Sequence, residues 1–187
     1  MTQVHLSLHV LFAAIVISLV TAVVAADKSD RLNHESLKLM LENMGYEIHK
    51  AGKYNSGAPW YQLKFKEGGA DYFVMVSLPK DQKTVWVIAD LVNLDKQQEL
   101  PRVIAIKMLD HNYIDSKHVY FSFGAKGRHL RLKGALPNRS VTPIALRTLI
   151  RETLETLKTE KQIWEPKKWP QEDKGTMGQP KEGKAAH

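Results

Sequence analysis

Residues 71–91 hold the pattern that most restricts the fold of this chain. They read DYFVMVSLPKDQKTVWVIADL, two apolar runs joined by a short polar loop. Two such runs on either side of a turn predict an antiparallel hairpin. A hairpin with one face in water should alternate apolar and polar residues, but these runs are apolar at nearly every position. The chain must therefore cover both faces of this hairpin, or leave an apolar surface for a partner.

A simple register divides this hairpin into two faces, because successive side chains of a strand point to opposite sides. The first face is almost entirely aliphatic and should meet helices; it carries Tyr72, Val74, Val76, Leu78, Val85, Val87, Ala89 and Leu91. The second face has a polar rim of Ser77, Thr84 and Asp90. Within that rim lies what we call the second-face patch, the predicted partner-binding residues Phe73, Met75, Trp86 and Ile88.

The sequence leaves three possibilities for what covers the second-face patch. The chain itself could cover it, through its middle helix or through Trp164 and Trp169. A second copy of the chain could cover it, which would make the protein a homodimer. The third cover is a segment of another protein.

The first 26 residues predict a signal peptide. Val10–Ala26 contains no charge, ends in small residues and is followed by the polar segment 27–30. No Lys or Arg precedes this run, which leaves the α-amino group as its positive charge. We expect cleavage near Ala26 and export to the periplasm or the medium. The alternative is an uncleaved membrane anchor, for which a run of about 17 residues is at the short end.

The remaining chain divides into one domain and a tail. Residues 27–164 carry the regular apolar patterns, whereas residues 165–187 are rich in Pro, Gly, Lys and Glu and should be disordered. The absence of cysteine excludes disulfides, a thiol nucleophile and a cysteine metal site. The net charge of +7 favours anionic partners such as lipid headgroups, polysaccharide or acidic proteins.

Hydrophobic periodicity predicts three helices and five to six strands in the domain. Asp30 should cap the first helix, the second should begin at Pro101 with Asn112 as its end, and the third should have Thr142 as its cap and Pro143 as its first residue. Four strands lie between the first two helices and two between the last two. Because short loops join the strands, we predict an α+β fold, a two-layer sandwich of an antiparallel sheet packed with helices.

Four segments of the domain resemble one bacterial family. They are LENMGYEIHKAG, the aromatic hairpin, LPRVIAIKMLDHN and ALPNRSVTPIALRTLIRETL. Their order and apolar positions are similar to those of the YbjN-like group, which shares the fold of type III secretion chaperones. The resemblance covers roughly residues 30–164 and implies an α/β sandwich that binds protein segments, often dimerises and has no enzyme activity. The basic charge and the export signal depart from secretion chaperones, which are cytosolic and typically acidic.

No motif in the sequence indicates catalysis or a bound cofactor. The histidines are scattered without the His-Glu-x-x-His spacing of a zinc site, so we expect no metal. Ser77 and Ser122 lie on strands, without the Gly-x-Ser-x-Gly elbow of hydrolases. The glycines lack the spacing of a phosphate-binding loop. We therefore predict a protein that is not an enzyme, with no cofactor and no catalytic residues.

A second hairpin, residues 126–133, is strongly basic. Its predicted anion-binding residues are Lys126, Arg128, Arg131 and Lys133. Such charges protect many edge strands from aggregation, or they form a surface for lipid, glycan or an acidic partner. Nucleic acid is not favoured, because Tyr120 is the only obvious aromatic on the adjacent strand. Nearby, Asn138-Arg139-Ser140 matches a glycosylation sequon, which matters only in a eukaryotic host.

Together these patterns favour an exported protein-binding or chaperone-like module that buries apolar partner segments on the second sheet face. The alternative is a peripheral binder of anionic lipid or glycan, acting through residues 126–133. The expected partners are a protein or peptide segment, a second copy of the chain, or an anionic envelope surface.

Overall fold

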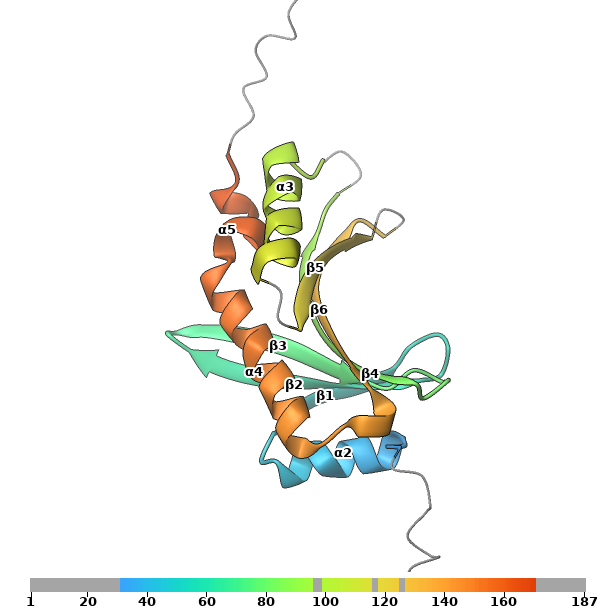
Figure 1. The fold of residues 1–187 in the computed structure, drawn as a ribbon. Coiled ribbons are helices and arrows are strands. Elements are labelled where there is room, and N and C mark those ends of the chain that lie inside the picture. The colour runs from blue at the N-terminus through green and yellow to red at the C-terminus, as the bar shows by residue number, and fades with distance from the viewer. Residues whose placement is uncertain (1–30, 96–98, 116–117, 125–126, 171–187) are drawn as a thin grey trace, which may run out of the picture.

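A six-stranded antiparallel sheet with helices packed on one face forms the domain (Figure 1). This computed structural model describes residues 31–95, 99–115, 118–124 and 127–170. It confirms the predicted α+β fold. The predicted signal peptide, Lys126 and the chain after residue 170 lie outside the described residues. No helix within these ranges is long and apolar enough to cross a bilayer.

The elements follow the predicted order. The strands are β1 (Ile48–Lys53), β2 (Pro59–Glu67), β3 (Ala70–Ser77), β4 (Thr84–Asn93), β5 (Val119–Gly124) and β6 (His129–Pro137). The helices are α2 (His34–Asn43), α3 (Arg102–Asp110), α4 (Pro143–Thr159) and α5 (Lys161–Trp164), with a π-helical turn η1 (His111–Asp115) and 3-10 turns η2 (Asn138–Ser140) and η3 (Pro166–Lys168). The strand order is β1-β2-β3-β4-β6-β5. The chain leaves the sheet after β4 through α3 and returns as the edge strand β5, and β6 then lies between β5 and β4.

Alternation along the strands buries one face of the sheet against the helices. The strands contribute fully buried aliphatic side chains, among them Val76, Val87 and Leu132. The predicted stripe of α4 is buried, as Leu146, Leu149, Ile150, Thr153 and Leu157 show. The leucines and the isoleucine of this stripe belong to one hydrophobic cluster with Leu37 and Leu41 of α2. Helices and strands therefore share a single core on this side of the sheet.

Side-chain caps set the starts of α2 and α4. Thr142 caps α4 as predicted, since its Oγ1 accepts a hydrogen bond from Ala145 N at 3.1 Å. The cap of α2 is Asn33, whereas we predicted Asp30, which lies outside the described residues. Asn33 Oδ1 accepts from Ser36 N, and Ser36 Oγ accepts from Asn33 N, both at 2.8 Å. This capping box has serine where the usual pattern has Glu or Gln, so the sequence pattern did not reveal it.

Asn112 does not end the middle helix, contrary to the prediction. The chain continues through η1, and the Asn112 side chain bonds the backbone of β5. Its Nδ2 donates to Phe121 O at 2.8 Å, and its Oδ1 accepts from Phe121 N at 2.7 Å. These two bonds imitate a neighbouring strand at the outer edge of β5. The amide thus protects this edge from pairing with another chain.

Trp164 and Trp169 lie on the helix side of the molecule. Their Nε1 groups donate to Leu157 O and Ile163 O, both at 3.0 Å, and their rings pack against the core cluster. Neither residue covers the second sheet face, which was one of the possibilities left open by the sequence. The middle helix α3 also packs on the core side, through Ile104 and Met108.

Candidate functional site

The residues of the second-face patch lie side by side on the sheet. β3 and β4 pair Met75 with Ile88 and Ser77 with Trp86. Phe73 is 39% exposed, and Met75, Trp86 and Ile88 are half-buried. The described helices pack on the opposite face of the sheet, so none of them covers the patch (Figure 1). The geometry brings the four residues together on an open face; partner binding by them stays a prediction.

Trp60 of β2 extends this surface, although we did not predict it. The register places Trp60 beside Ser77, which in turn lies beside Trp86. The Trp60 ring lies over Gly52 of β1, where an added Cβ would come within 2.5 Å of the ring. Ser77, expected at the polar rim, is instead only 2% exposed. Alternation along β2 indicates the face on which Trp60 lies: Tyr61 and Leu63 point into the core, so Trp60 points to the second sheet face.

Paired charges border the second-face patch. Lys64 Nζ lies 2.6 Å from Asp71 Oδ2 and 5.7 Å from the centroid of the Phe73 ring. The hydrogen bond from Lys64 holds the pKa of Asp71 below its ordinary value. The site therefore has an apolar centre and a charged border, the usual anatomy of a protein–protein interface.

We expect the Lys64–Asp71 pair to make the stability of the fold depend on pH in the acidic range. Because the folded-state pKa of Asp71 is below the ordinary value of 3.8, its contribution is complete above that pH and is lost as the pH falls through the depressed pKa. Urea midpoints of the wild type and Asp71→Asn, measured from about pH 7 to about pH 2, test this. The small difference in urea midpoint between the two proteins should be constant around neutral pH and should shrink as the pH is lowered. A difference that grows towards low pH would contradict the assignment.

Two of the predicted anion-binding residues of the basic hairpin contact acceptors within the chain. Arg131 Nε lies 2.5 Å from Asp90 Oδ1, and Arg128 Nε donates to Asp95 O at 3.1 Å. Lys133 pairs in register with Ile88, on the border of the second-face patch. Lys126 lies outside the described residues. Arg128 and Arg131 thus have partners within the chain, and anion binding by this hairpin stays a prediction.

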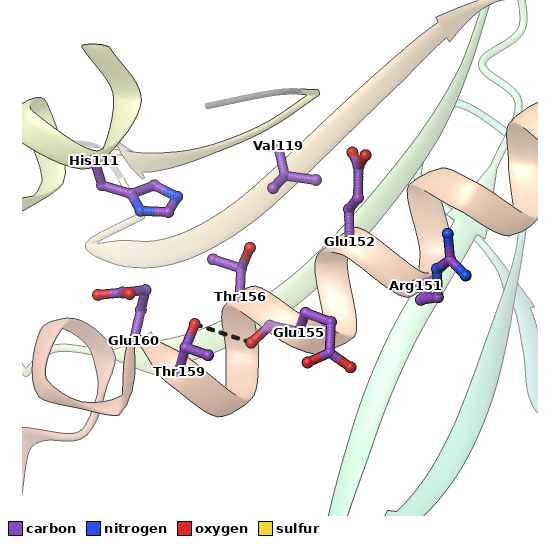
Figure 2. A pocket seen from close by; sticks show the side chains of 8 residues that line it. All are labelled: His111, Val119, Arg151, Glu152, Glu155, Thr156, Thr159 and Glu160. Carbon is purple, nitrogen blue, oxygen red and sulfur yellow. Dashed lines mark hydrogen bonds between the residues drawn. The ribbon is translucent and has the colours of Figure 1, made fainter. Parts of the chain in front are cut away.

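A polar cavity of about 460 Å³ lies between α4 and β5. Figure 2 shows its lining, which is His111, Val119, Arg151, Glu152, Glu155, Thr156, Thr159 and Glu160. Its carboxylates have partners in the chain, since Glu152 Oε2 lies 2.9 Å from His118 Nδ1 and Glu155 Oε1 lies 2.6 Å from Lys158 Nζ. In the described part of the chain, no group of three or more His, Cys, Asp or Glu could hold a metal ion.

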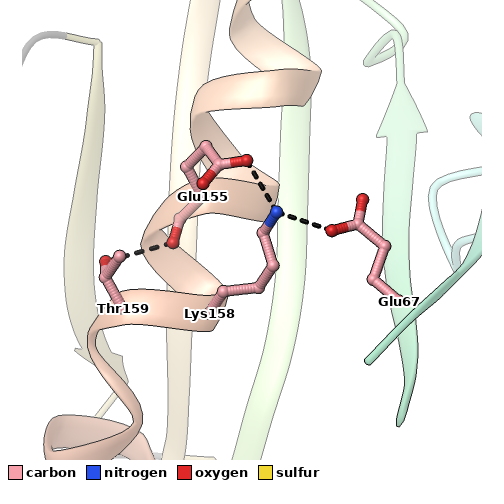
Figure 3. A network of polar contacts seen from close by, with 4 residues as sticks. All are labelled: Glu67, Glu155, Lys158 and Thr159. Carbon is pink, nitrogen blue, oxygen red and sulfur yellow. Dashed lines mark hydrogen bonds and ion pairs between the residues drawn. The ribbon is translucent and has the colours of Figure 1, made fainter. Parts of the chain in front are cut away.

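Lys158 connects α4 to the end of the β2–β3 hairpin (Figure 3). Its Nζ lies 2.6 Å from Glu155 Oε1 and 2.6 Å from Glu67 Oε2. Hydrogen bonds to these two carboxylates raise the pKa of Lys158 to about 12. Its charge is therefore engaged within the fold, and we assign Lys158 a structural role.

A second apolar surface, not predicted from the sequence, lies on α3 and η1. Its large side chains are Val103, Ile106, Leu109, Tyr113 and Ile114, all of them exposed. Leu109 is 67% exposed and Tyr113 is 91% exposed. The opposite side of α3 is also apolar, because Ile104 and Met108 are buried in the core. The sequence VIAIKML indicates this surface, since a helix that is apolar on all sides must bury its outer side against something other than its own core.

Comparisons with known proteins find a distant likeness in fold only. No family model and no curated protein matches the chain. The solved HopA1–SchA chaperone–effector complex contains a similar chain, with a TM-score of 0.43, 11% identity, and coverage of 65% of this chain and 90% of that chain. YbjN from E. coli is similar with a TM-score of 0.40, 13% identity, and coverage of 67% and 86%. At these scores the likeness carries no functional argument, so the proposals below depend on the residues of this chain.

Proposed function

We propose that this chain is an exported, non-enzymatic protein-binding module that buries an apolar partner segment against the second-face patch. One observation carries this proposal: Phe73, Met75, Trp86 and Ile88 form a continuous apolar surface that no described helix covers. Apolar surfaces of this kind mark interaction sites on soluble domains. Trp and Met also adapt to apolar partners of varied shape.

The border of the patch on β6 favours a partner segment with an acidic residue at one end. On β2, Lys64 pairs in register with Phe73, and on β6, Lys133 pairs with Ile88. The whole chain has a net charge of +7. An apolar segment with a carboxylate near Lys133 would match this surface, because Lys64 is already paired with Asp71 and complementary charges steer association and reject wrong partners.

Export rests on the amino-acid sequence. The uncharged run Val10–Ala26 and the polar residues after it have the layout of a cleaved signal peptide. The intact mass of the protein recovered from the envelope and from the medium tests this. A mass that lacks the first 26 residues would support export with cleavage, whereas a retained N-terminus would favour the membrane anchor.

A photoreactive phenylalanine analogue at position 73 should crosslink to a partner polypeptide in cells. Tyr54, in the turn between β1 and β2, is a matched control because it is 38% exposed, against 39% for Phe73. We expect adducts from position 73 that position 54 does not give. Trp86→Ser should reduce these adducts at least about five-fold, because large aromatics at the centre of an interface carry much of its binding energy.

Other outcomes of this experiment would change the assignment. Equal adducts at positions 73 and 54, or adducts at position 73 that survive Trp86→Ser in a folded protein, would contradict partner binding by the patch. Adducts between two copies of this chain would assign the patch to self-association. Salt-sensitive binding to anionic vesicles, lost when Arg128, Arg131 and Lys133 become Gln, would favour the anionic-surface alternative.

A further inference from the structure

An apolar groove of about 430 Å³ lies between α2 and the start of α4. Both helices pack on the core side of the sheet (Figure 1). Most of the wall comes from α2, whose lining residues recur at intervals of three and four and so share one side of the helix. The apolar lining consists of Leu32, Leu39, Met40, Met44 and Pro143. Leu39 is 51% exposed, so this apolar wall is open to solvent.

The two ends of this groove differ in their chemistry. Leu32 precedes the first turn of α2, whereas Met44 is its C-cap, so the two residues lie at opposite ends of the helix. Arg147 of α4 is at the Met44 end, because its Nη2 donates to Met44 O at 3.5 Å. α2 has 10 residues, which gives the groove a length of about 15 Å. The groove is therefore apolar along its length and cationic at one end.

The charge at that end is not neutralised by a carboxylate. Among the described residues that line the groove, Arg147 is the only charged one. Within the described ranges, no carboxylate forms an ion pair with its guanidinium group. Burial raises the pKa of Tyr46, and the charges of Arg147 and Arg151 oppose this rise, so a second cation lies near the same end. An anionic group placed there would meet a positive potential.

We propose that this groove binds a single-chain anionic amphiphile, such as a fatty acid, with its alkyl chain along Leu39 and Met40 and its carboxylate at Arg147. Apolar walls with one placed polar group are typical of small-molecule sites, in which the polar group sets the orientation of the ligand. An extended chain of about twelve carbons has about the length of the groove. Methionine side chains adapt to a flexible chain of this kind.

A polypeptide segment suits this groove less well than an alkyl chain does. Each buried peptide group of such a segment would need a hydrogen-bond partner. Besides Arg147, the lining offers only the side chains of Ser36 and Asn43 as polar groups among the described residues. An alkyl chain makes no such demand, so the chemistry of the walls favours a lipid-like ligand.

This inference goes beyond the proposed function, because the groove and the second-face patch lie on opposite sides of the sheet. Both sites could therefore be occupied at the same time. Dodecanoate has about 14 non-hydrogen atoms, and a ligand of that size should bind with a dissociation constant of about 1 mM or below.

Methionine methyl groups report where such a ligand binds. We would titrate the purified protein, expressed from the complete sequence with methyl-labelled methionine, with dodecanoate below its micelle concentration and record NMR spectra. The signals of Met40 and Met44 should shift, whereas Met75 of the second-face patch and Met108 of the core should not. Dodecyltrimethylammonium has the same chain and the opposite charge, and should bind at least about ten-fold more weakly.

Two substitutions separate the charge from the apolar wall. Arg147→Gln should raise the dissociation constant of dodecanoate at least about five-fold without weakening dodecyltrimethylammonium, because it removes only the charge. Leu39→Asn should weaken both ligands, because it reduces the apolar wall that they share. Arg102→Gln and Ile144→Asn, at exposed positions of α3 and α4 outside the groove, are the matched controls and should change neither affinity.

Several results would overturn the proposal. They are the absence of dodecanoate binding, equal affinity for the two amphiphiles, shifts centred on Met75, and an affinity that survives Arg147→Gln in a folded protein. A leucine-rich peptide with a free C-terminal carboxylate that displaced dodecanoate at a lower concentration would reassign the groove to a polypeptide end. None of these results bears on adducts at Phe73, so the groove and the proposed function are tested separately.

Discussion

Asn138→Asp should lower the free energy of unfolding by about 3 kcal/mol or more. Asn138 is 0% exposed. Its Oδ1 accepts from Leu32 N at 3.0 Å, and its Nδ2 donates to Leu32 O at 2.7 Å and to Gln82 O at 2.8 Å. A carboxylate would set a negative oxygen against two carbonyl oxygens, and nothing there would neutralise it. Asn138→Ala should cost about 2–3 kcal/mol, because it leaves the half-buried backbone groups of Leu32 and Gln82 without this partner.

Urea denaturation of these variants measures the effect. Asn93, exposed at the end of β4, is the matched control, and Asn93→Ala should stay within about 0.5 kcal/mol of the wild type. If Asn138→Ala also stayed within that range, the hydrogen bonds from Asn138 to Leu32 and Gln82 would not contribute the stability expected of them. The same geometry argues against a glycan at the Asn138 sequon: a sugar on Nδ2 would replace one of its two donated hydrogen bonds, and the 0% exposed side chain has no room for it in the folded domain.

Gly134→Val should destabilise the domain by about 2–3 kcal/mol. Gly134 lies on β6 where α4 crosses the sheet. An added Cβ there would lie 2.5 Å from Leu149 Cδ1 and 3.1 Å from His118 O. The leucine could move aside, but the backbone oxygen of His118 could not without shifting the start of β5. Either response disturbs the contact that holds α4 against the sheet.

A double-mutant cycle separates this clash from a general effect on β6. Leu149→Ala alone should cost about 2–5 kcal/mol by opening a cavity in the core. In the Gly134→Val protein its cost should fall by at least about 1 kcal/mol, because the valine methyls occupy part of that cavity. Gly124→Val is the control, since a Cβ there meets nothing nearer than His129 O at 3.9 Å. Strict additivity of the two substitutions would contradict the proposed contact.

The second-face patch could be predicted only in part. Alternation along the two strands was enough to group Phe73 and Met75 with Trp86 and Ile88, because the side-chain period of a strand is two. Trp60 was missed because its place depends on the pairing of β2 with β3 and on the room left by Gly52 of β1. The exposed apolar side of α3 was not predicted, since periodicity cannot tell a buried side of a helix from an exposed one when both are apolar.

The sequence by itself determined the order of helices and strands, the cap of α4 and the two faces of the hairpin. These features depend on neighbouring residues, because helical and strand periods and capping bonds span only a few positions. The tertiary structure alone decided which apolar surfaces stay open and where buried amides find partners. Asn138 and Leu32, for example, are 106 residues apart in the chain. Whether an apolar face is core or interface depends on where distant helices pack, and no local pattern contains that information.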